Sequence, residues 1–154
     1  LQQGQEFDPS TEHLPHFIPP KEAWQDDSNE LYKKYPLILM SERPRFRVHS
    51  QFFGNELLRE LDPEPTVKMN QIDADAREIK TGDYVECYND RGHCVAKVVI
   101  NNGIRPGTLV YPKSWQANQH KAGSWSELAS SDFDPVAVNQ NYFDNLCEMR
   151  KWEE

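Results

Sequence analysis

Short apolar runs separated by turn residues dominate the chain from residue 35 onward. Runs of this length, either continuous or alternating with polar positions, are typical of buried or half-buried strands. Four stretches show the pattern: LILM at 37–40, TVKMN at 66–70, YVECYNDRGHCVAKVVI at 84–100 and TLVYP at 108–112. The third stretch predicts two strands around the turn Asn89-Asp90-Arg91-Gly92, in which Gly92 takes a positive φ.

Two stretches between these runs have helical spacing instead. The first is SQFFGNELLREL, whose apolar residues predict a short amphipathic helix: Phe53, Leu57, Leu58 and Leu61. The second follows Asn70, a good N-cap residue, and has Asp73 in its first turn, where a carboxylate suits the helix dipole. Its apolar stripe is Ile72, Ala76 and Ile79.

The remaining segments carry no sustained period. Residues 1–34 are rich in Pro, Glu, Gln and Asp and predict an extended or flexible arm, and residues 35–154 form the predicted folded domain. Residues 113–139 predict a long irregular loop, and residues 142–154 predict a closing strand or a helix. Several short strands with small helices in their connections predict a mainly β fold, a compact β-barrel.

Composition narrows the partners of the chain. It has 154 residues, with 25 acidic and 17 basic side chains and a formal net charge of -8. A general nucleic-acid binder needs cations over a broad face, and no apolar run here is long enough to cross a bilayer. We therefore expect no nucleic-acid partner and no membrane insertion. The chain begins within polar sequence, which we interpret as a piece of a longer protein.

The cysteines are three in number and include no C-x-x-C pair, so a zinc site is not expected. We expect Cys87, Cys94 and Cys147 to be small buried residues. A cross-strand disulfide between Cys87 and Cys94, which flank the predicted hairpin turn, is the alternative.

The most distinctive binding chemistry lies in SERPRFRVHSQ, directly after the first predicted strand. The sequence contains no G-x-S-x-G, G-x-G-x-x-G or P-loop pattern and no zinc-spaced histidine pair beside a glutamate. Arginine binds phosphate through two parallel hydrogen bonds, and neutral His, Ser and Gln side chains suit a heterocycle. The candidate residues are Ser41, Glu42, Arg43, Arg45, Arg47, His49, Ser50 and Gln51. The alternative is an edge strand whose alternating arginines lie in solvent.

A second candidate segment is residues 113–128. Two large aromatic residues, Trp115 and Trp125, stand there among Gln116, Asn118, Gln119, His120 and Ser126. Aromatic and amide side chains in an irregular loop suit stacking on a flat ring and recognition of its edge. The alternative is a loop that the two tryptophans pin to the core.

Taken in order, these segments resemble the C-terminal dinucleotide-binding domain of molybdopterin oxidoreductases of the dimethyl sulfoxide reductase family. YPLIL with SERPRFRVHSQ resembles the family's first strand and cofactor loop, and RxHSQ is most similar to the dimethyl sulfoxide and trimethylamine oxide reductase branch. VKMNQIDADAREIKTGDYVECYNDRGHCVAKVVINNGIRPGTLVYP resembles the central block, and FDP and YFDNLCEMRK fit the tail. The similarity runs from about Tyr35 to the end of the chain.

The resemblance implies a double-psi β-barrel of the aspartate decarboxylase-like type. It also implies a cofactor, bis(molybdopterin guanine dinucleotide), that carries molybdenum or tungsten. The segment 41–50 would lie against the anionic pterin and pyrophosphate, which accounts for local arginines in an acidic chain. An extended segment would place Arg43, Arg45 and Arg47 on one side. Further implied contacts are Lys113, Trp115, Ser126 (Asn in many relatives), Tyr142, Asp144 and Asn145.

The resemblance further implies partners. The protein ligand of the metal, the iron–sulfur cysteines and the substrate pocket would belong to upstream domains of the same polypeptide, so this chain alone would not turn over substrate. An iron–sulfur electron-transfer subunit is another partner that the family allows. The parent would be an oxidoreductase of a bacterium or archaeon, periplasmic or cytoplasmic, of the kind used in anaerobic respiration, with its substrate left open.

Two other functions are compatible with a double-psi barrel. One is a cofactor-free domain for protein interaction. The other is a self-contained enzyme related to aspartate decarboxylase, which would need a Gly-Ser cleavage site at a barrel strand. The only such pair, Gly123-Ser124, lies in the late loop and disfavours that function.

Overall fold

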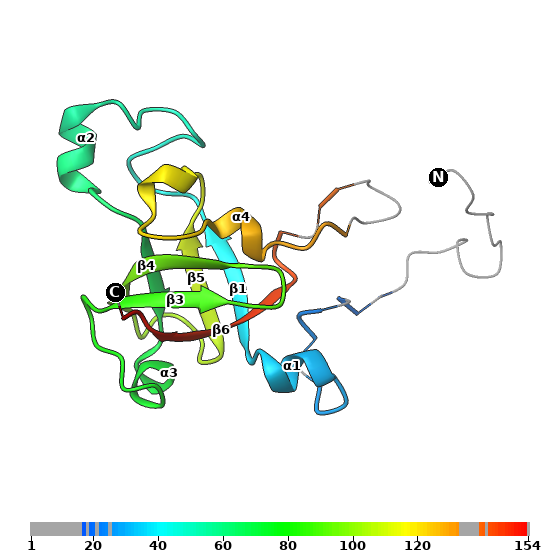
Figure 1. Cartoon of the computed structure of the whole chain (residues 1–154). Coiled ribbons are helices and arrows are strands. Elements are labelled where there is room, and N and C mark those ends of the chain that lie inside the picture. The colour runs from blue at the N-terminus through cyan, green and yellow to red at the C-terminus, as the bar shows by residue number, and fades with distance from the viewer. Residues whose placement is uncertain are drawn as a thin grey trace.

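The computed structural model shows six strands and five short helices in the part of the chain that it describes (Figure 1). The described residues are 17, 19–20, 22–24, 26–132, 139–140 and 142–153. The strands are β1 (Leu37–Glu42), β2 (Thr66–Met69), β3 (Tyr84–Tyr88), β4 (His93–Ile100), β5 (Thr108–Pro112) and β6 (Asn145–Lys151). The helices are α1 (Glu30–Lys34), α2 (Glu56–Leu61), α3 (Gln71–Asp75), the 3-10 helix η1 (Ala117–Gln119) and α4 (Trp125–Leu128).

The strands close into a barrel in the order β1-β5-β2-β4-β3-β6. β1 is parallel to β5 and β2 is parallel to β4, while the other neighbouring pairs are antiparallel. Exchanging β1, β2 and β3 with β4, β5 and β6 maps this order onto itself. The two halves therefore interlock through two parallel pairs, β1 with β5 and β2 with β4, and the fold is the double-psi β-barrel that the resemblance implied.

The core fills the inside of the barrel. Leu37 and Leu39 of β1 and Val67 and Met69 of β2 are almost completely buried, which matches the alternation of apolar and polar positions in these strands. Burial of such side chains is the main force that stabilises the closed sheet. Because the barrel closes, it leaves no open strand edge.

Most predicted elements form at their predicted positions. The stretches at 37–40, 66–70 and 108–112 are strands, and 84–100 is the hairpin of β3 and β4. The tail, for which strand and helix were both open, forms strand β6. The predicted loop after β5 contains η1 and α4, and its residues 133–138 lie outside the described part.

The predicted arm is described only in part. Residues 1–16 lie outside the described residues. Nearer the barrel the chain forms α1, whose N-cap Asn29 accepts hydrogen bonds from the amides of Leu31 and Tyr32.

Both predicted helices form, but only part of each predicted apolar stripe is buried: Phe53 and Ile79 are in the core, and both lie outside the helices. α2 starts only at Glu56 and buries none of its residues, so Leu57 and Leu61 are 67% and 57% exposed. Asn70 caps α3 as predicted, through a 2.8 Å hydrogen bond from the amide of Ile72. Ile72 itself is 65% exposed, because α3 is a little over one turn long and buries Ala74 instead.

Glycine is required at position 92, but not for the predicted reason, a positive φ. Gly92 does not take a positive φ; the positive-φ glycines of the described residues are Gly82, Gly107 and Gly123. A Cβ atom on Gly92 would lie 2.6 Å from the Cβ atom of Glu127. Glycine is needed here because α4 packs directly on the hairpin.

The cysteines are buried free thiols, which confirms the first of the two predictions for them. Cys87 and Cys94 lie opposite each other on β3 and β4 without forming a disulfide. Burial raises the pKa of the Cys147 thiol well above its usual value, which keeps this thiol protonated and chemically inert.

Candidate functional site

Three segments that carry predicted site residues meet at one end of the barrel. β1 and β5 are parallel and pair Ser41 with Tyr111, so both strands end there. β6 is antiparallel to β1 and pairs Asn145 with Leu39, so it starts near the same end. In Figure 1 this is the upper end, opposite α3. We call residues 41–51, 113–116, 126 and 142–145 the rim.

The first two rim segments touch each other. The amide of Lys113 donates a 3.0 Å hydrogen bond to the carbonyl oxygen of Glu42. The Arg47 guanidinium lies 3.8 Å from the centre of the Trp115 ring and 4.4 Å from that of Phe53. These cation–π contacts join the loop after β1 to the loop after β5.

Arg47 is an internal anchor of this loop. It is 3% exposed, lies 3.0 Å from an Asp62 carboxylate oxygen and donates a 2.5 Å hydrogen bond to the Asp62 carbonyl. Burial lowers the pKa of Arg47 and raises that of Asp62, while each charge opposes the shift of the other. The guanidinium stays protonated because its intrinsic pKa is very high. The pair therefore ties the loop to the end of α2.

The three arginines do not lie on one side as an extended segment would place them. The chain turns at residues 45–46, so Arg43 and Arg45 are exposed while Arg47 points inward. The positive charge that the loop presents to solvent comes from Arg43 and Arg45. The carboxylate of Glu42 is already paired with Lys68 of β2.

Unusual backbone conformations are concentrated in the rim and at Phe52, which follows it directly. His49, Phe52 and Ser114 have φ values of 49°, 72° and 83°, and Glu78 is the one other non-glycine residue with positive φ among the described residues. Residues other than glycine rarely adopt such angles, and these conformations cluster at functional sites. His49, Ser50 and Gln51 are all exposed beside them.

The β6 side of the rim contains one buried and several exposed residues. Asn145 is fully buried; its side chain accepts a 2.7 Å hydrogen bond from the Ser130 amide and donates one of 3.0 Å to the Tyr142 carbonyl. Tyr142 is exposed, whereas Asp144 is partly buried. Burial, and secondarily the charge of Glu22, raises the pKa of Asp144.

An aromatic stack supports the rim from below. The Tyr111 ring stacks on Trp125 at 5.7 Å and on His120 at 5.9 Å, and its hydroxyl lies 3.0 Å from His120 Nδ1. Burial lowers the pKa of His120. Trp125 thereby holds α4, and with it the exposed Ser126, next to the rim. This pattern agrees with the prediction that the tryptophans pin this loop to the core, although it leaves Ser126 accessible.

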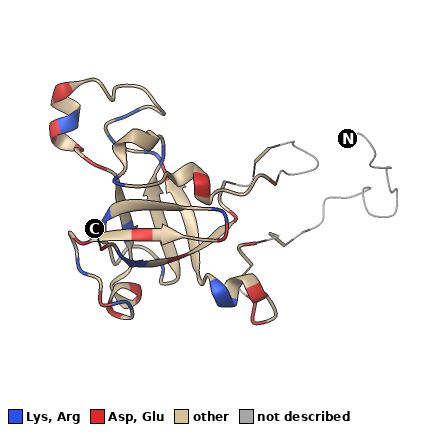
Figure 2. Cartoon of the chain, viewed as in Figure 1, with Lys and Arg blue, Asp and Glu red and all other residues tan. Residues whose placement is uncertain are grey.

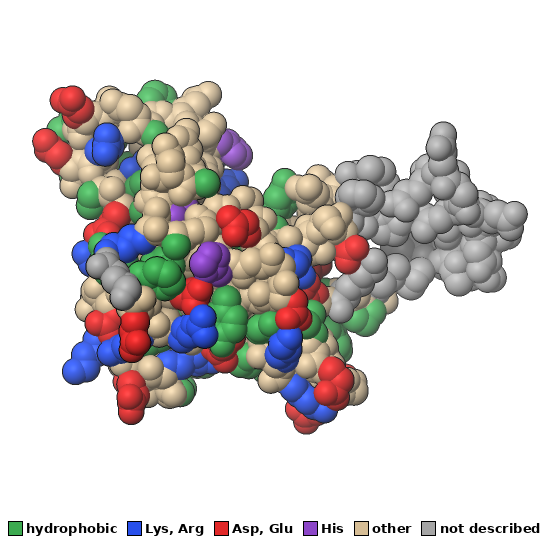
Figure 3. Space-filling model, viewed as in Figure 1, with side chains coloured by type: hydrophobic (Ala, Val, Ile, Leu, Met, Phe, Trp, Pro, Cys, Tyr) green, Lys and Arg blue, Asp and Glu red, His purple; other side chains and the backbone are tan. Residues whose placement is uncertain are grey.

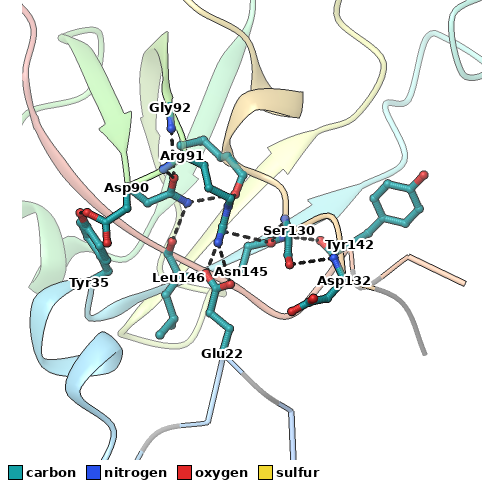
Figure 4. Close-up of polar contacts among 12 residues, drawn as sticks. Glu22, Tyr35, Asp90, Arg91, Gly92, Ser130, Asp132, Tyr142, Asn145 and Leu146 are labelled. Carbon is teal, nitrogen blue, oxygen red and sulfur yellow. Dashed lines mark hydrogen bonds and ion pairs between the residues drawn. The ribbon is translucent and has the colours of Figure 1, made fainter. Parts of the chain in front are cut away.

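Sequence reasoning missed two residues that hold the rim in place (Figure 4). The Glu22 carboxylate pairs with Arg91 through two hydrogen bonds of 2.8 and 2.9 Å and accepts a third, of 2.8 Å, from the Leu146 amide. Arg91 also donates to the Leu128 carbonyl at 2.6 and 3.0 Å. Nothing in the sequence pairs Glu22 with Arg91, because 69 residues separate them.

On the face of the molecule that Figures 2 and 3 show, the described acidic and basic residues are intermixed. Acidic and basic residues alternate along the ribbon in Figure 2, and the face in Figure 3 carries both kinds interspersed with hydrophobic side chains. Within the described part of the chain, no group of three or more His, Cys, Asp or Glu side chains is placed to hold a metal ion. No helix of the described residues has the length and apolar character needed to span a membrane.

A barrel that gathers cationic and aromatic loops at one end fits the family resemblance, and the comparisons with known proteins agree. The family described as "Molydopterin dinucleotide binding domain" matches residues 37–147. The chain belongs to this family. The comparisons support molybdopterin guanine dinucleotide as the cofactor.

Known relatives are much longer than the chain. It is 32% identical, over 132 residues, to a Halobacterium salinarum protein named as the catalytic chain of a dimethyl sulfoxide reductase, covering 86% of the chain and 16% of that relative. It is 32% identical over 109 residues to the pyrogallol hydroxytransferase large subunit of Pelobacter acidigallici, covering 64% and 12%. The chain thus spans about one-sixth or less of these relatives.

A solved structure supports the fold. Acetylene hydratase from Pelobacter acetylenicus superposes with a TM-score of 0.78 at 20% sequence identity, covering 90% of this chain and 21% of that protein. At this identity the likeness concerns the fold alone.

Proposed function

We propose that this chain is the cofactor-holding domain of a longer molybdenum oxidoreductase, and that its rim binds the phosphate-bearing part of bis(molybdopterin guanine dinucleotide). The observation that carries the proposal is the meeting of the segments after β1, after β5 and before β6 at one end of the barrel. A bulky dinucleotide needs contacts from several segments at once, and binding loops on a rigid scaffold supply them.

The rim residues divide into those that would contact the ligand and those that support them. Arg43 and Arg45 would bind the pyrophosphate, because they are the exposed arginines of the loop. The exposed polar side chains that would add hydrogen bonds are His49, Ser50, Gln51, Ser126 and Tyr142. Arg47 and Asn145 would act by holding their segments in shape, since both are buried and bonded within the protein.

Three further rim residues would help to shape the ligand site. The Lys113 side chain is partly accessible and follows β5 directly, so it could approach the pyrophosphate. Trp115 would support the loop through Arg47, and its buried ring nitrogen has no hydrogen-bond partner within the described chain. Asp144 would need a neutral or donor-rich ligand group nearby, because its pKa is raised.

The cofactor would supply the redox chemistry, and this chain would bind it, orient it and shield its phosphates from water. The two relatives described above are named for different reactions, on dimethyl sulfoxide and on pyrogallol, yet both match this chain. A shared cofactor role explains such a match better than a role in choosing substrate. The substrate pocket would then lie in other domains of the same polypeptide, and an iron–sulfur electron-transfer subunit would join the whole enzyme.

Cofactor analysis of the full-length polypeptide tests this proposal. Molybdenum, and the guanosine monophosphate released by acid hydrolysis, would be measured for the wild type and for Arg43→Ala/Arg45→Ala. Each charge-assisted hydrogen bond is worth about 1.5–3 kcal/mol, so we expect cofactor retention to weaken at least tenfold. Arg105→Ala, in the turn at the opposite end of the barrel, is the matched control and should retain the wild-type content. Full retention by the double variant would refute the assignment of these arginines.

A further inference from the structure

The apolar side of α2 is left uncovered by the rest of the described chain. The helix is six residues long and buries none of them, and its two most exposed leucines, Leu57 and Leu61, lie about one turn apart. A helix this short is not stable in water without tertiary contacts. In Figure 1, α2 projects from the upper edge of the molecule, away from the barrel.

The same apolar surface continues onto the loop before the helix. Val48 and Phe52 are exposed as well. With Leu57 and Leu58 they line a groove of about 420 Å³, whose other lining residues are Arg45, Phe46, Arg47 and Asn55. We call Val48, Phe52, Leu57 and Leu61 the α2 face. A contiguous exposed patch of this kind marks an interaction site, whereas a single exposed residue such as Ile72 needs no explanation.

We propose that the α2 face docks against an apolar surface of the same polypeptide outside this chain. The inference rests on the proposed function, in which this chain is one domain of a longer enzyme. The chain covers 16% and 12% of two of its curated relatives, so most of such a polypeptide is available to cover the face.

Side-chain chemistry favours a protein surface over the cofactor as the occupant. Burying aliphatic side chains against other apolar groups is favourable because it removes apolar surface from water. Phosphates and sugars are polar and provide no such apolar surface. The polar side of α2 carries Glu56, Arg59 and Glu60, seen as alternating charges in Figure 2. An apolar centre flanked by charged residues is the usual anatomy of a protein interface.

Hydrogen exchange of the full-length protein tests the inference. The amides of residues 58–61 would be followed in the 154-residue chain and in the full-length polypeptide, with and without bound cofactor. We expect at least tenfold slower exchange in the full-length protein in both cofactor states. Equal rates in the chain and the full-length protein would overturn the inference. So would slow exchange only with cofactor bound, which would assign the face to the ligand, or slow exchange in the chain that depends on concentration, which would assign it to a second copy.

A matched pair of variants separates docking from folding. Leu57→Glu/Leu61→Glu should abolish the slow exchange of α2 in the full-length protein and leave the melting temperature of the 154-residue chain within a few degrees. Ile72→Glu, at a similarly exposed position on α3, should change neither. If the double variant behaves like Ile72→Glu in the full-length protein, the inference fails. If the full-length protein never binds molybdopterin, even when the cofactor is supplied, and α2 is still protected, the proposed function fails while the docking is supported.

Discussion

Replacing Glu22 by Ala should destabilise the barrel far more than a surface substitution does. The Glu22 side chain is 11% exposed and its partner Arg91 is 33% exposed. Breaking a buried ion pair by removing one partner costs about 3–5 kcal/mol. Arg91 still reaches water and keeps its hydrogen bonds to the Leu128 carbonyl, so the cost of breaking the ion pair should lie at the lower end of this range. The Leu146 amide also loses its acceptor, which costs about 1 kcal/mol or more. The expected loss is therefore about 3 kcal/mol.

One effect of this substitution acts in the opposite direction. The Glu22 charge raises the pKa of Asp144, so removing it relieves a repulsion at neutral pH. Glu22 is only the second cause of that raised pKa, after burial, whereas the substitution removes all three hydrogen bonds that Glu22 accepts. The net change remains destabilising.

Urea denaturation followed by circular dichroism measures this loss. Glu22→Ala, Arg91→Ala and the double variant form a cycle whose coupling energy should be about 1–3 kcal/mol. Glu30→Ala is the matched control, because the Glu30–Lys33 pair is largely exposed and worth about 0.2–0.5 kcal/mol. If Glu22→Ala destabilises the chain no more than Glu30→Ala does, the arm does not hold the start of β6 and this reasoning is wrong.

Three further substitutions test other parts of the structure. Gly123→Ala should lower the free energy of unfolding by more than about 2 kcal/mol in urea denaturation, because φ is 61° and a Cβ would overlap a main-chain oxygen of β4. Gly54 lies in open space, so Gly54→Ala should change it by no more than about 0.5 kcal/mol. Similar losses in the two variants would contradict this prediction. Asp144→Asn should raise the melting temperature at pH 7. The raised pKa of Asp144 means that the folded state binds the proton more tightly than the unfolded state, so the stability of the wild type falls as pH rises above about 3.8. The gain in melting temperature should therefore vanish in acid. Equal melting temperatures at pH 7 would refute that sign. Arg47→Ala should cost about 3 kcal/mol or more by leaving Asp62 unpaired, and a loss below about 1 kcal/mol would show that Arg47 is not an anchor.

The barrel could be predicted from the sequence because its strands carry their own pattern. Alternation in TVKMN and the hairpin turn within 84–100 report local structure and burial together, and both are confirmed. The apolar residues of α2 predicted a helix face packed on the domain, and this prediction is wrong for a physical reason. Apolar spacing predicts that a face will be covered but does not say by what, and the chain itself leaves Leu57 and Leu61 uncovered.

The sequence predicted where the rim lies, but not which of its residues are exposed and which are buried supports. The run of arginines marked the loop after β1, yet spacing could not reveal the turn at 45–46 that sends Arg47 inward. Asp62, the partner of Arg47, lies 15 residues away along the chain, and Glu22 lies 69 residues from Arg91. Such pairings depend on how the chain closes in space. Gly92 shows the same limit, because its need for glycine comes from α4 rather than from its own turn.

The position of the cofactor in the full-length protein tests the central claim most directly. In a structure of the loaded protein, we expect the pyrophosphate within hydrogen-bond distance of residues 41–51 and the nucleotide between these residues and 142–145. A pyrophosphate bound at the opposite end of the barrel, near α3 and the turn at 101–107, would contradict the account.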